Sequence, residues 1–245
     1  MKTRISLLLA AALLAAGSCT KRPVQPRFGI AATDTLVSRN GIACKIEYRF
    51  ASILNAGKSP ALTAIEQANI GYFFDLEAFS GTVREAVAAA IGQFADIYLA
   101  DSLPTGSGNA EYEISAESEG AVVDTLVVYT ITQSSYTGGA HGMYSRENYV
   151  YSLDGGYEIT LADLFTEAQL ESLGRLIRRK LYEQYDVRDD EGLVAAGFCP
   201  EYIAPTENFL VTPESIVFCY NPYEIGCYAL GSVEVEVTRE ELAGL

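Results

Sequence analysis

Apolar and polar residues alternate along several stretches of the chain, a pattern typical of strands that bury one face. The clearest stretch runs from Gly41 to Leu54. One of its faces carries Ile42, Cys44, Ile46, Tyr48 and Phe50, and the other carries Lys45, Glu47 and Arg49. Segments rich in β-branched and aromatic residues are also predicted strands. The complete set of predicted strands is 41–54, 112–116, 122–132, 144–153, 209–212, 216–220 and 233–237.

Three other stretches place apolar residues three or four positions apart, which predicts amphipathic helices. The first follows Pro60 and ends before residues 79–81. The second begins at Thr82, whose spacing from Glu85 is that of a capping box. The third is capped by Thr166 and has an apolar stripe of Leu170, Leu173, Ile177 and Leu181.

The predicted strands and helices are grouped in blocks, and no regular βαβ rhythm is present. Such grouping is typical of an α+β fold built from antiparallel sheets with packed helices. Two arrangements remain open at this point, a single unit or two subdomains joined near residues 100–110.

The net charge of the chain restricts the classes of molecule that it is expected to bind. Of 245 residues, 49% are hydrophobic, and the net charge is −15. Residues 1–27 hold five basic residues and no acidic one, so the rest carries 12 basic and 32 acidic residues, a net charge of −20. This acidity argues against nucleic-acid binding, which needs clustered Lys and Arg. It favours either a basic partner or simply solubility.

The N-terminus has the features of a secretory signal peptide. Lys2 and Arg4 precede an apolar run from Ile5 to Ala16, and small residues follow, up to Cys19. Small residues before a cysteine resemble the bacterial lipobox, in which that cysteine becomes the acylated first residue of the mature chain. Ala16 stands where that signal usually has Leu, so ordinary cleavage after a small residue is the alternative.

An acylated Cys19, carrying chains such as palmitate, would attach the protein to a membrane without a spanning helix. Pro23 and Pro26 then indicate a short extended tether. No Asp follows Cys19 directly, and in the bacterial sorting rule this resembles an outer-membrane destination. We therefore expect an envelope lipoprotein that faces the periplasm.

Four further cysteines are present, and an oxidising compartment permits disulfides. Cys44 and Cys219 lie in apolar predicted strands, which favours buried free thiols. A local bridge between Cys219 and Cys227 is the alternative, and four cysteines allow three pairings in all. Neither their spacing nor the single histidine indicates a metal site, and no cofactor is expected.

Two sets of segments resemble a known family. The first consists of 136–142 (Tyr-Thr-Gly-Gly-Ala-His-Gly), 149–151 and 159–165, and the second of 209–214 and 221–229. Both are similar to the secreted bacterial domain of the RsiV/PdaC type, over roughly residues 30–242. That domain is the extracellular part of a lysozyme-sensing anti-sigma factor and an accessory region of some peptidoglycan deacetylases.

The resemblance implies a shared envelope module rather than a shared activity, because neither a transmembrane segment nor a deacetylase domain is expected in this chain. It suits a basic protein such as lysozyme, or peptidoglycan, as the partner. The expected organisation is a signal peptide (1–18), a lipidated cysteine with its tether (19–29), an N-terminal α+β subdomain (30–105) and a C-terminal subdomain of the RsiV/PdaC type (106–245).

The segment from Thr137 to Gly142 combines three glycines with the only histidine, and tyrosines flank it. Glycines allow close backbone approach, and His can act as acid, base or ligand. The alternative is a plain connection between strands, with glycines for turn geometry. The candidate ligand-binding residues are Tyr136, Gly139, His141, Gly142, Tyr144, Tyr151, Tyr223 and Glu224.

Three functions remain open on these grounds. The favoured one is a lipid-anchored envelope module that binds a protein or a cell-wall glycan. The second is a cell-wall hydrolase that uses His141 and a carboxylate, although no nucleophile motif of the GxSxG type is present. The third is a purely structural envelope lipoprotein. The basic cluster of Arg175, Arg178, Arg179 and Lys180 is read as the solvated face of a helix.

Overall fold

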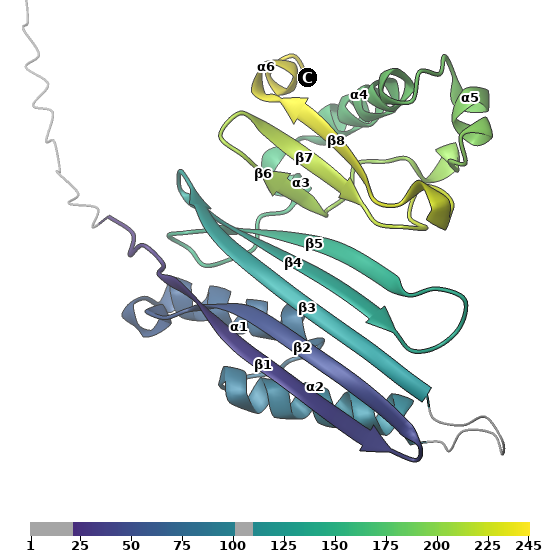
Figure 1. Cartoon of the computed structure of the whole chain (residues 1–245). Helices are drawn as coiled ribbons and strands as arrows, with labels where there is room; N and C mark the ends of the chain where they lie inside the picture. Colours follow the sequence, from purple (N-terminus) through teal and green to yellow (C-terminus); the bar gives the residue numbers. More distant parts are fainter. Residues whose placement is uncertain (1–21, 101–109) are drawn as a thin grey trace, which may run out of the picture.

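The computed structural model describes residues 22–100 and 110–245, and Cys19 therefore lies outside the described residues. The larger of two sheets has five strands in the order β1-β2-β3-β4-β5 (Figure 1). Its strands are β1 (Phe28–Arg39), β2 (Ile42–Ile53), β3 (Ala110–Val123), β4 (Leu126–Tyr136) and β5 (Met143–Ser152). The sheet thus takes strands from both sides of residues 101–109.

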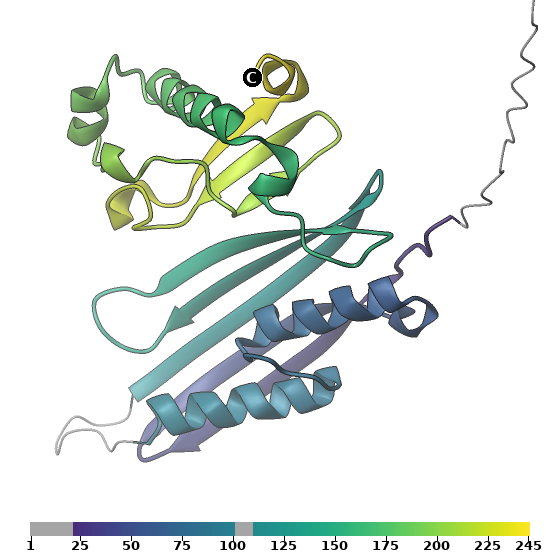
Figure 2. The same ribbon diagram turned by 180° about the vertical axis from the view of Figure 1, so that it is seen from behind.

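Neighbouring strands of this sheet run antiparallel except for one pair. β2 and β3 are parallel, with Ile42 opposite Ala110. The reason lies in the connection between them, which contains α1 (Pro60–Phe74) and α2 (Val83–Tyr98). Both helices cover one face of the sheet (Figure 2), and such a crossover returns the chain in the same direction. The α+β fold is confirmed, with this parallel pair as an addition to the expected antiparallel pairing.

Two tight turns differ from the sequence prediction. β1 was not predicted, and it pairs with β2 along its whole length. The hairpin turn between them is Asn40-Gly41, where both residues have positive φ, of 54° and 83°. The predicted strand 122–132 is interrupted, because Asp124, at φ 54°, turns the chain between β3 and β4.

The C-terminal part forms a second, three-stranded sheet in the order β6-β7-β8. α4 lies across it in Figure 2 and is capped, as predicted, by Thr166, which forms a capping box with Gln169. The elements of this part are α3 (Leu161–Leu164), α4 (Glu167–Gln184), α5 (Asp190–Ala195), β6 (Phe209–Val211), β7 (Ser215–Tyr220), β8 (Val233–Thr238) and α6 (Arg239–Ala243). Short 3₁₀ helices lie at Ala56–Lys58, Pro200–Tyr202 and Tyr228–Leu230.

Two hydrophobic cores hold these layers together. One fills the space between the five-stranded sheet and helices α1 and α2, with Phe50, Phe73 and Tyr129 at its centre. The other lies between α4 and the second sheet, and it reaches Val128 and Val150 on the opposite face of the first sheet. No helix within the described residues combines the length and the apolarity that a membrane span requires.

Two asparagines from the C-terminal part cover the outer edge of β5. Asn221 accepts a hydrogen bond from the backbone N–H of Arg146 at 2.8 Å and donates one to its carbonyl oxygen at 3.3 Å. Asn208 donates to the same carbonyl at 2.7 Å and accepts from the N–H of Asn148 at 2.9 Å. Edge strands present unpaired backbone groups, and these amides satisfy them at the join between the two sheets.

Candidate functional site

Two loops that are distant in sequence meet beside the start of β5. The imidazole of His141, in the β4–β5 loop, stacks on the ring of Tyr228 with centroids 4.1 Å apart and planes at 22°. The hydroxyl of Tyr228 donates to the carbonyl oxygen of Gly142 at 2.9 Å. The two segments that carry the sequence resemblance are therefore in direct contact.

Two more tyrosines extend this contact. Tyr144 meets Tyr228 edge to face at 6.0 Å, and Tyr223 lies 5.5 Å from the same ring. We refer to His141, Tyr144, Tyr223 and Tyr228 as the aromatic cluster. Tyr144 and Tyr223 are 38% and 56% exposed. The cluster therefore presents aromatic surface to solvent, although its rings already contact one another.

Glycine geometry shapes the β4–β5 loop. Gly138 and Gly139 have φ values of 95° and 94°, in the left-handed region that side chains disfavour. A Cβ on Gly142 would stand 2.7 Å from the carbonyl oxygen of Ser135, so the backbone needs glycine there. The hydroxyl of Tyr136 donates to the carbonyl of Gly139 at 3.2 Å and holds the loop against β4.

The second loop contains a backbone outlier. Residues 221–224 form a turn closed by the N–H of Glu224 and the carbonyl of Asn221 at 3.1 Å. Pro222 occupies the second position, and Tyr223, in the third, has φ 75°. This turn type normally has Gly or Asn in that position. A bulky residue at positive φ costs of order 1–3 kcal/mol, and such strain is concentrated at functional sites.

A small network of polar side chains is hydrogen-bonded to this turn. Asn221 donates to Glu147 at 2.8 Å, and its N–H donates to the carboxylate of Glu224 at 3.0 Å. Burial raises the pKa of Glu147, and the charge of Glu224 raises it further, while the bond from Asn221 lowers it. Glu224 thus serves as a brace within the turn that positions Tyr223.

The exposed face of the first sheet lies next to the aromatic cluster and is strongly acidic. We call it the acidic face, and its β3 positions carry Glu111, Glu113, Glu117 and Glu119, all exposed. Its three cations pair with carboxylates other than these four. Lys45 pairs with Glu47, Arg49 with Asp34 and Arg146 with Glu234, at 2.6, 2.8 and 2.6 Å.

None of the four β3 glutamates has an ion-pair partner in the part of the chain that the structure describes. A cavity of about 310 Å³ joins this face to the aromatic cluster, and it is lined by Lys45, Glu113, Tyr136, Tyr144 and Tyr228 among others. The unpaired negative charge and the exposed rings therefore form one continuous surface.

The remaining candidates lie elsewhere or have structural partners. Tyr151 is 1% exposed, and its hydroxyl donates to Asn69 in α1 at 2.8 Å, so it is not brought to the cluster. In the basic cluster, Arg178 pairs with Asp190 at 2.6 Å and Lys180 with Glu241 at 2.7 Å. The four cysteines at 44, 199, 219 and 227 are free thiols.

The ring of His141 has few polar neighbours among the described residues. Its Nδ1 atom lies 2.9 Å from the carbonyl oxygen of Gly142, and no carboxylate among the described residues is hydrogen-bonded to its ring. Residues 22–100 and 110–245 also contain no group of three His, Cys, Asp or Glu side chains placed to hold a metal ion. The sequence-based prediction of the site did not include the β3 glutamates beside the loop. The signal that could have identified them is the alternation of glutamates with apolar residues along this strand.

Comparisons with known proteins relate the chain to one family. Residues 162–240 match the family model described as a protein of unknown function, DUF3298. A search of curated proteins found none that matches. Among solved structures, a member of the DUF3298 family from Bacteroides fragilis is similar, with a TM-score of 0.78, 24% identity, and coverage of 90% of this chain and 93% of that one.

A DUF3298 family protein from Pseudomonas aeruginosa is also similar, with a TM-score of 0.62 and 16% identity over 91% of this chain and 94% of that one. At these low identities, the TM-scores establish a shared fold alone. The matched segment includes Tyr223 and Tyr228, whereas His141 and Tyr144 precede it. The C-terminal part of the chain carries a DUF3298 domain, a domain of unknown function, within a fold that members of that family share over most of their length.

Proposed function

We propose that the protein is a binding module of the bacterial cell envelope whose partner is a basic protein, with lysozyme as the first candidate. The observation that carries this proposal is the exposed, strained Tyr223 beside a sheet face with four unpaired glutamates. Tyr is enriched among the residues that dominate binding energy at protein interfaces. Unpaired carboxylates around such residues attract Lys and Arg on a partner and speed its association.

The resemblance to the RsiV/PdaC type supports the choice of partner, because the ectodomain of the anti-sigma factor in that group senses lysozyme. The net charge of −15 supports it as well. In this proposal the aromatic cluster packs against the partner, and the acidic face orients it. Tyr136, Gly139 and Gly142 maintain the loop geometry, and Glu224 braces the turn.

The binding test uses the full chain and lysozyme in isothermal titration calorimetry. Tyr223→Ala should weaken binding about tenfold, a typical loss for a central interface tyrosine. The matched control is Tyr157→Ala, because Tyr157 is 59% exposed and lies beyond the opposite end of β5. Raising the salt concentration from 50 to 500 mM should weaken wild-type binding, since exposed charges are screened.

The proposal would be overturned by the absence of lysozyme binding, or by equal losses for Tyr223→Ala and Tyr157→Ala. Saturable binding to peptidoglycan in place of lysozyme would favour a glycan as the ligand. Turnover of peptidoglycan that His141→Ala abolishes would favour the hydrolase alternative.

We also infer that Cys19 anchors the module to the outer membrane, facing the periplasm. The support is the apolar run that ends in small residues before Cys19, and Pro23 and Pro26 after it. Mass spectrometry of the mature protein should find acyl chains on an N-terminal Cys19. Cys19→Ala should release the protein into the soluble periplasmic fraction, and an unmodified N-terminus in the wild type would refute the anchor.

A further inference from the structure

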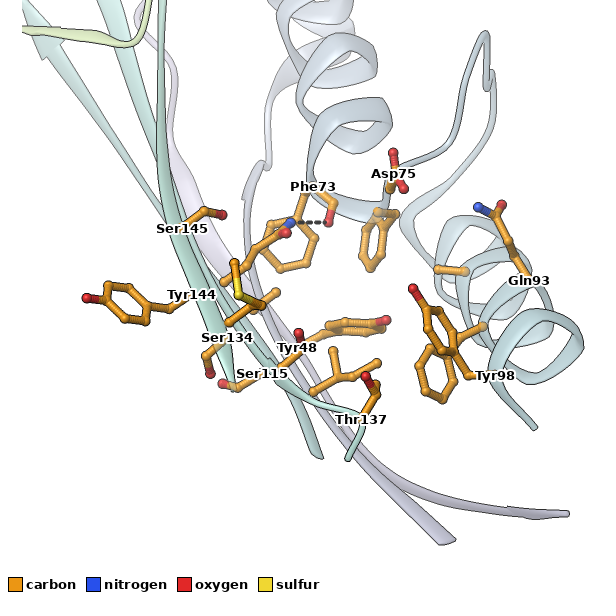
Figure 3. A pocket seen from close by; sticks show the side chains of 18 of the residues that line it. Tyr48, Phe73, Asp75, Gln93, Tyr98, Ser115, Ser134, Thr137, Tyr144 and Ser145 are labelled. Atoms are coloured by element: carbon orange, nitrogen blue, oxygen red, sulfur yellow. Dashed lines mark hydrogen bonds between the residues drawn. The ribbon is translucent and has the colours of Figure 1, made fainter. Parts of the chain in front are cut away.

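A second concave site lies on the helix-covered face of the first sheet, opposite the acidic face. α1 ends at Phe74, before the sheet does, and the space beyond it is bounded by α2 and by the ends of β3, β4 and β5. The cavity has a volume of about 460 Å³ (Figure 3). Pockets for small molecules typically measure 300–1,000 Å³, so the cavity is large enough for a small organic ligand.

Aromatic rings form two walls of this cavity. Tyr48 and Phe74 meet edge to face at 5.3 Å on the side of the sheet and α1. Phe94 and Tyr98 stack at 4.9 Å on the side of α2. Figure 3 shows Tyr48 and Tyr98 pointing into the same space, whereas Tyr144 points away from it.

The floor and the mouth of the cavity differ in exposure. Tyr48, Phe74 and Phe94 are buried, whereas Ile97 and Met143 at the mouth are 61% and 45% exposed. Burial raises the pKa of Tyr48 to about 12, so its hydroxyl is neutral in the physiological range. An apolar group that enters through the mouth would therefore contact a buried, uncharged aromatic floor.

The electrostatics of the cavity favour a positive charge. Asp75 lies on its rim, directly after the last residue of α1, with φ 51°. The carbonyl end of a helix carries partial negative charge, and the faces of aromatic rings attract cations. No Lys, Arg or His is among the described residues that line the cavity. These features act in one direction, and no basic side chain in the described part of the lining opposes them.

We propose that this cavity binds a small organic cation, an ammonium group attached to an aromatic or branched apolar body. The apolar body fills the space between the two aromatic walls. The ammonium remains at the rim, near Asp75 and the end of α1. An anionic ligand of the same shape is disfavoured by Asp75 and by the charge of the whole chain. The site is separate from the proposed lysozyme surface, because Tyr144 is the one member of the aromatic cluster among its described lining residues, and its ring points away from the cavity (Figure 3).

Three probes of matched size test this site by calorimetry on the full chain: phenethylammonium, 2-phenylethanol and 3-phenylpropionate. The cation should bind about tenfold more tightly than the neutral alcohol, which corresponds to about 1.4 kcal/mol. This difference in binding free energy is the sum of two expected contributions: the attraction of the ammonium to an exposed carboxylate and its attraction to the faces of the aromatic rings. The carboxylate probe should show no binding at the same concentrations.

Two variants separate the sources of this preference. Asp75→Asn should weaken binding of the cation about threefold and leave the alcohol unchanged, because Asn also adopts the left-handed conformation. Tyr98→Leu replaces the aromatic ring by an aliphatic side chain and should weaken the cation more than the alcohol. The matched control is Asp186→Asn, since Asp186 follows α4 with φ 52° and does not line the cavity.

Equal affinities for the three probes would overturn the proposal, and so would the absence of binding by the cation. An equal effect of Asp75→Asn and Asp186→Asn would also overturn it, because the preference would then reflect only the net charge. Lysozyme binding by the same preparations is measured in parallel, so that failure of one proposal is distinguished from failure of the other.

Discussion

The carboxylate of Glu66 in α1 accepts a hydrogen bond from the backbone N–H of Ile53 near the end of β2, at 2.7 Å. Its other oxygen accepts one from the hydroxyl of Ser52 at 2.6 Å. Glu66 is only 6% exposed. A helix and a strand that pack mainly through apolar contacts are thus also joined by a buried acidic side chain.

Removing this acceptor should destabilise the fold. Glu66→Leu retains the apolar contacts but leaves the N–H of Ile53 buried without a partner, which costs about 1–3 kcal/mol. Glu66→Gln keeps an oxygen acceptor and should lose less. Urea denaturation of the two variants measures the difference, and equal stabilities would mean that the hydrogen bond contributes nothing.

Glu66 should also give the stability a specific pH dependence. Burial raises its pKa in the folded state, although the bonds from Ser52 and Ile53 lower it in part. A raised acidic pKa means that the folded state binds more protons than the unfolded state. The contribution is therefore fully present below the unfolded pKa of Glu66 and is lost as pH rises through its folded pKa.

Glu66→Gln lacks this titration, so the free energy of unfolding of the wild type, relative to that of the variant, should decline as pH rises above the ordinary value for Glu. Denaturation at closely spaced pH values checks it. A difference that stays constant with pH, or that grows, would show that the folded pKa of Glu66 is not raised.

A substitution at Tyr223 should change the stability of the protein and its lysozyme binding in opposite directions. Tyr223→Gly relieves a left-handed backbone strain of about 1–2 kcal/mol, and part of this gain is offset by the greater freedom of Gly in the unfolded chain. We expect the variant to be about 0.5 kcal/mol more stable in thermal denaturation, while its lysozyme binding falls about tenfold. If the variant is more stable and still binds lysozyme normally, Tyr223 is not part of the binding interface.

The asparagine cover of β5 should be visible in amide exchange. Asn221→Ala removes the acceptor for the N–H of Arg146, and the exchange of that amide should accelerate by one to two orders of magnitude, since a lost buried bond costs about 1–3 kcal/mol. The amide of Asn148 is bonded to Asn208 and serves as the internal reference. Equal acceleration at both positions would indicate that the two sheets separate as a whole.

Much of the fold could be predicted from the sequence because local signals and burial agree there. The capping box of Thr82 and Glu85 marks the start of α2 as predicted. β1 escaped prediction although Asn40-Gly41 is a strong hairpin signal, because its outward positions mix Ile30 and Leu36 with small and polar residues. The parallel pairing of β2 and β3 depends on where two helices pack, which periodicity does not reveal.

The candidate site was predictable in part for the same reasons. The two loops could be identified from their glycines and aromatic residues, and they do meet at Tyr228. Tyr151 could not be assigned correctly, because the register of β5 places Tyr144 on one face and Tyr151 on the other. The cavity beside Asp75 exists because α1 stops short of the end of the sheet, a difference in length that no motif records.

The side-chain amides of Asn208 and Asn221 make the two edges of the first sheet unequal in their ability to accept another strand. A strand from another chain cannot add to β5 along the segment that these side chains occupy. On the opposite side, β1 has twelve residues and no strand beyond it among the described residues. Self-association through the first sheet would therefore use β1, and the antiparallel pairing of two β1 edges would give a closed dimer.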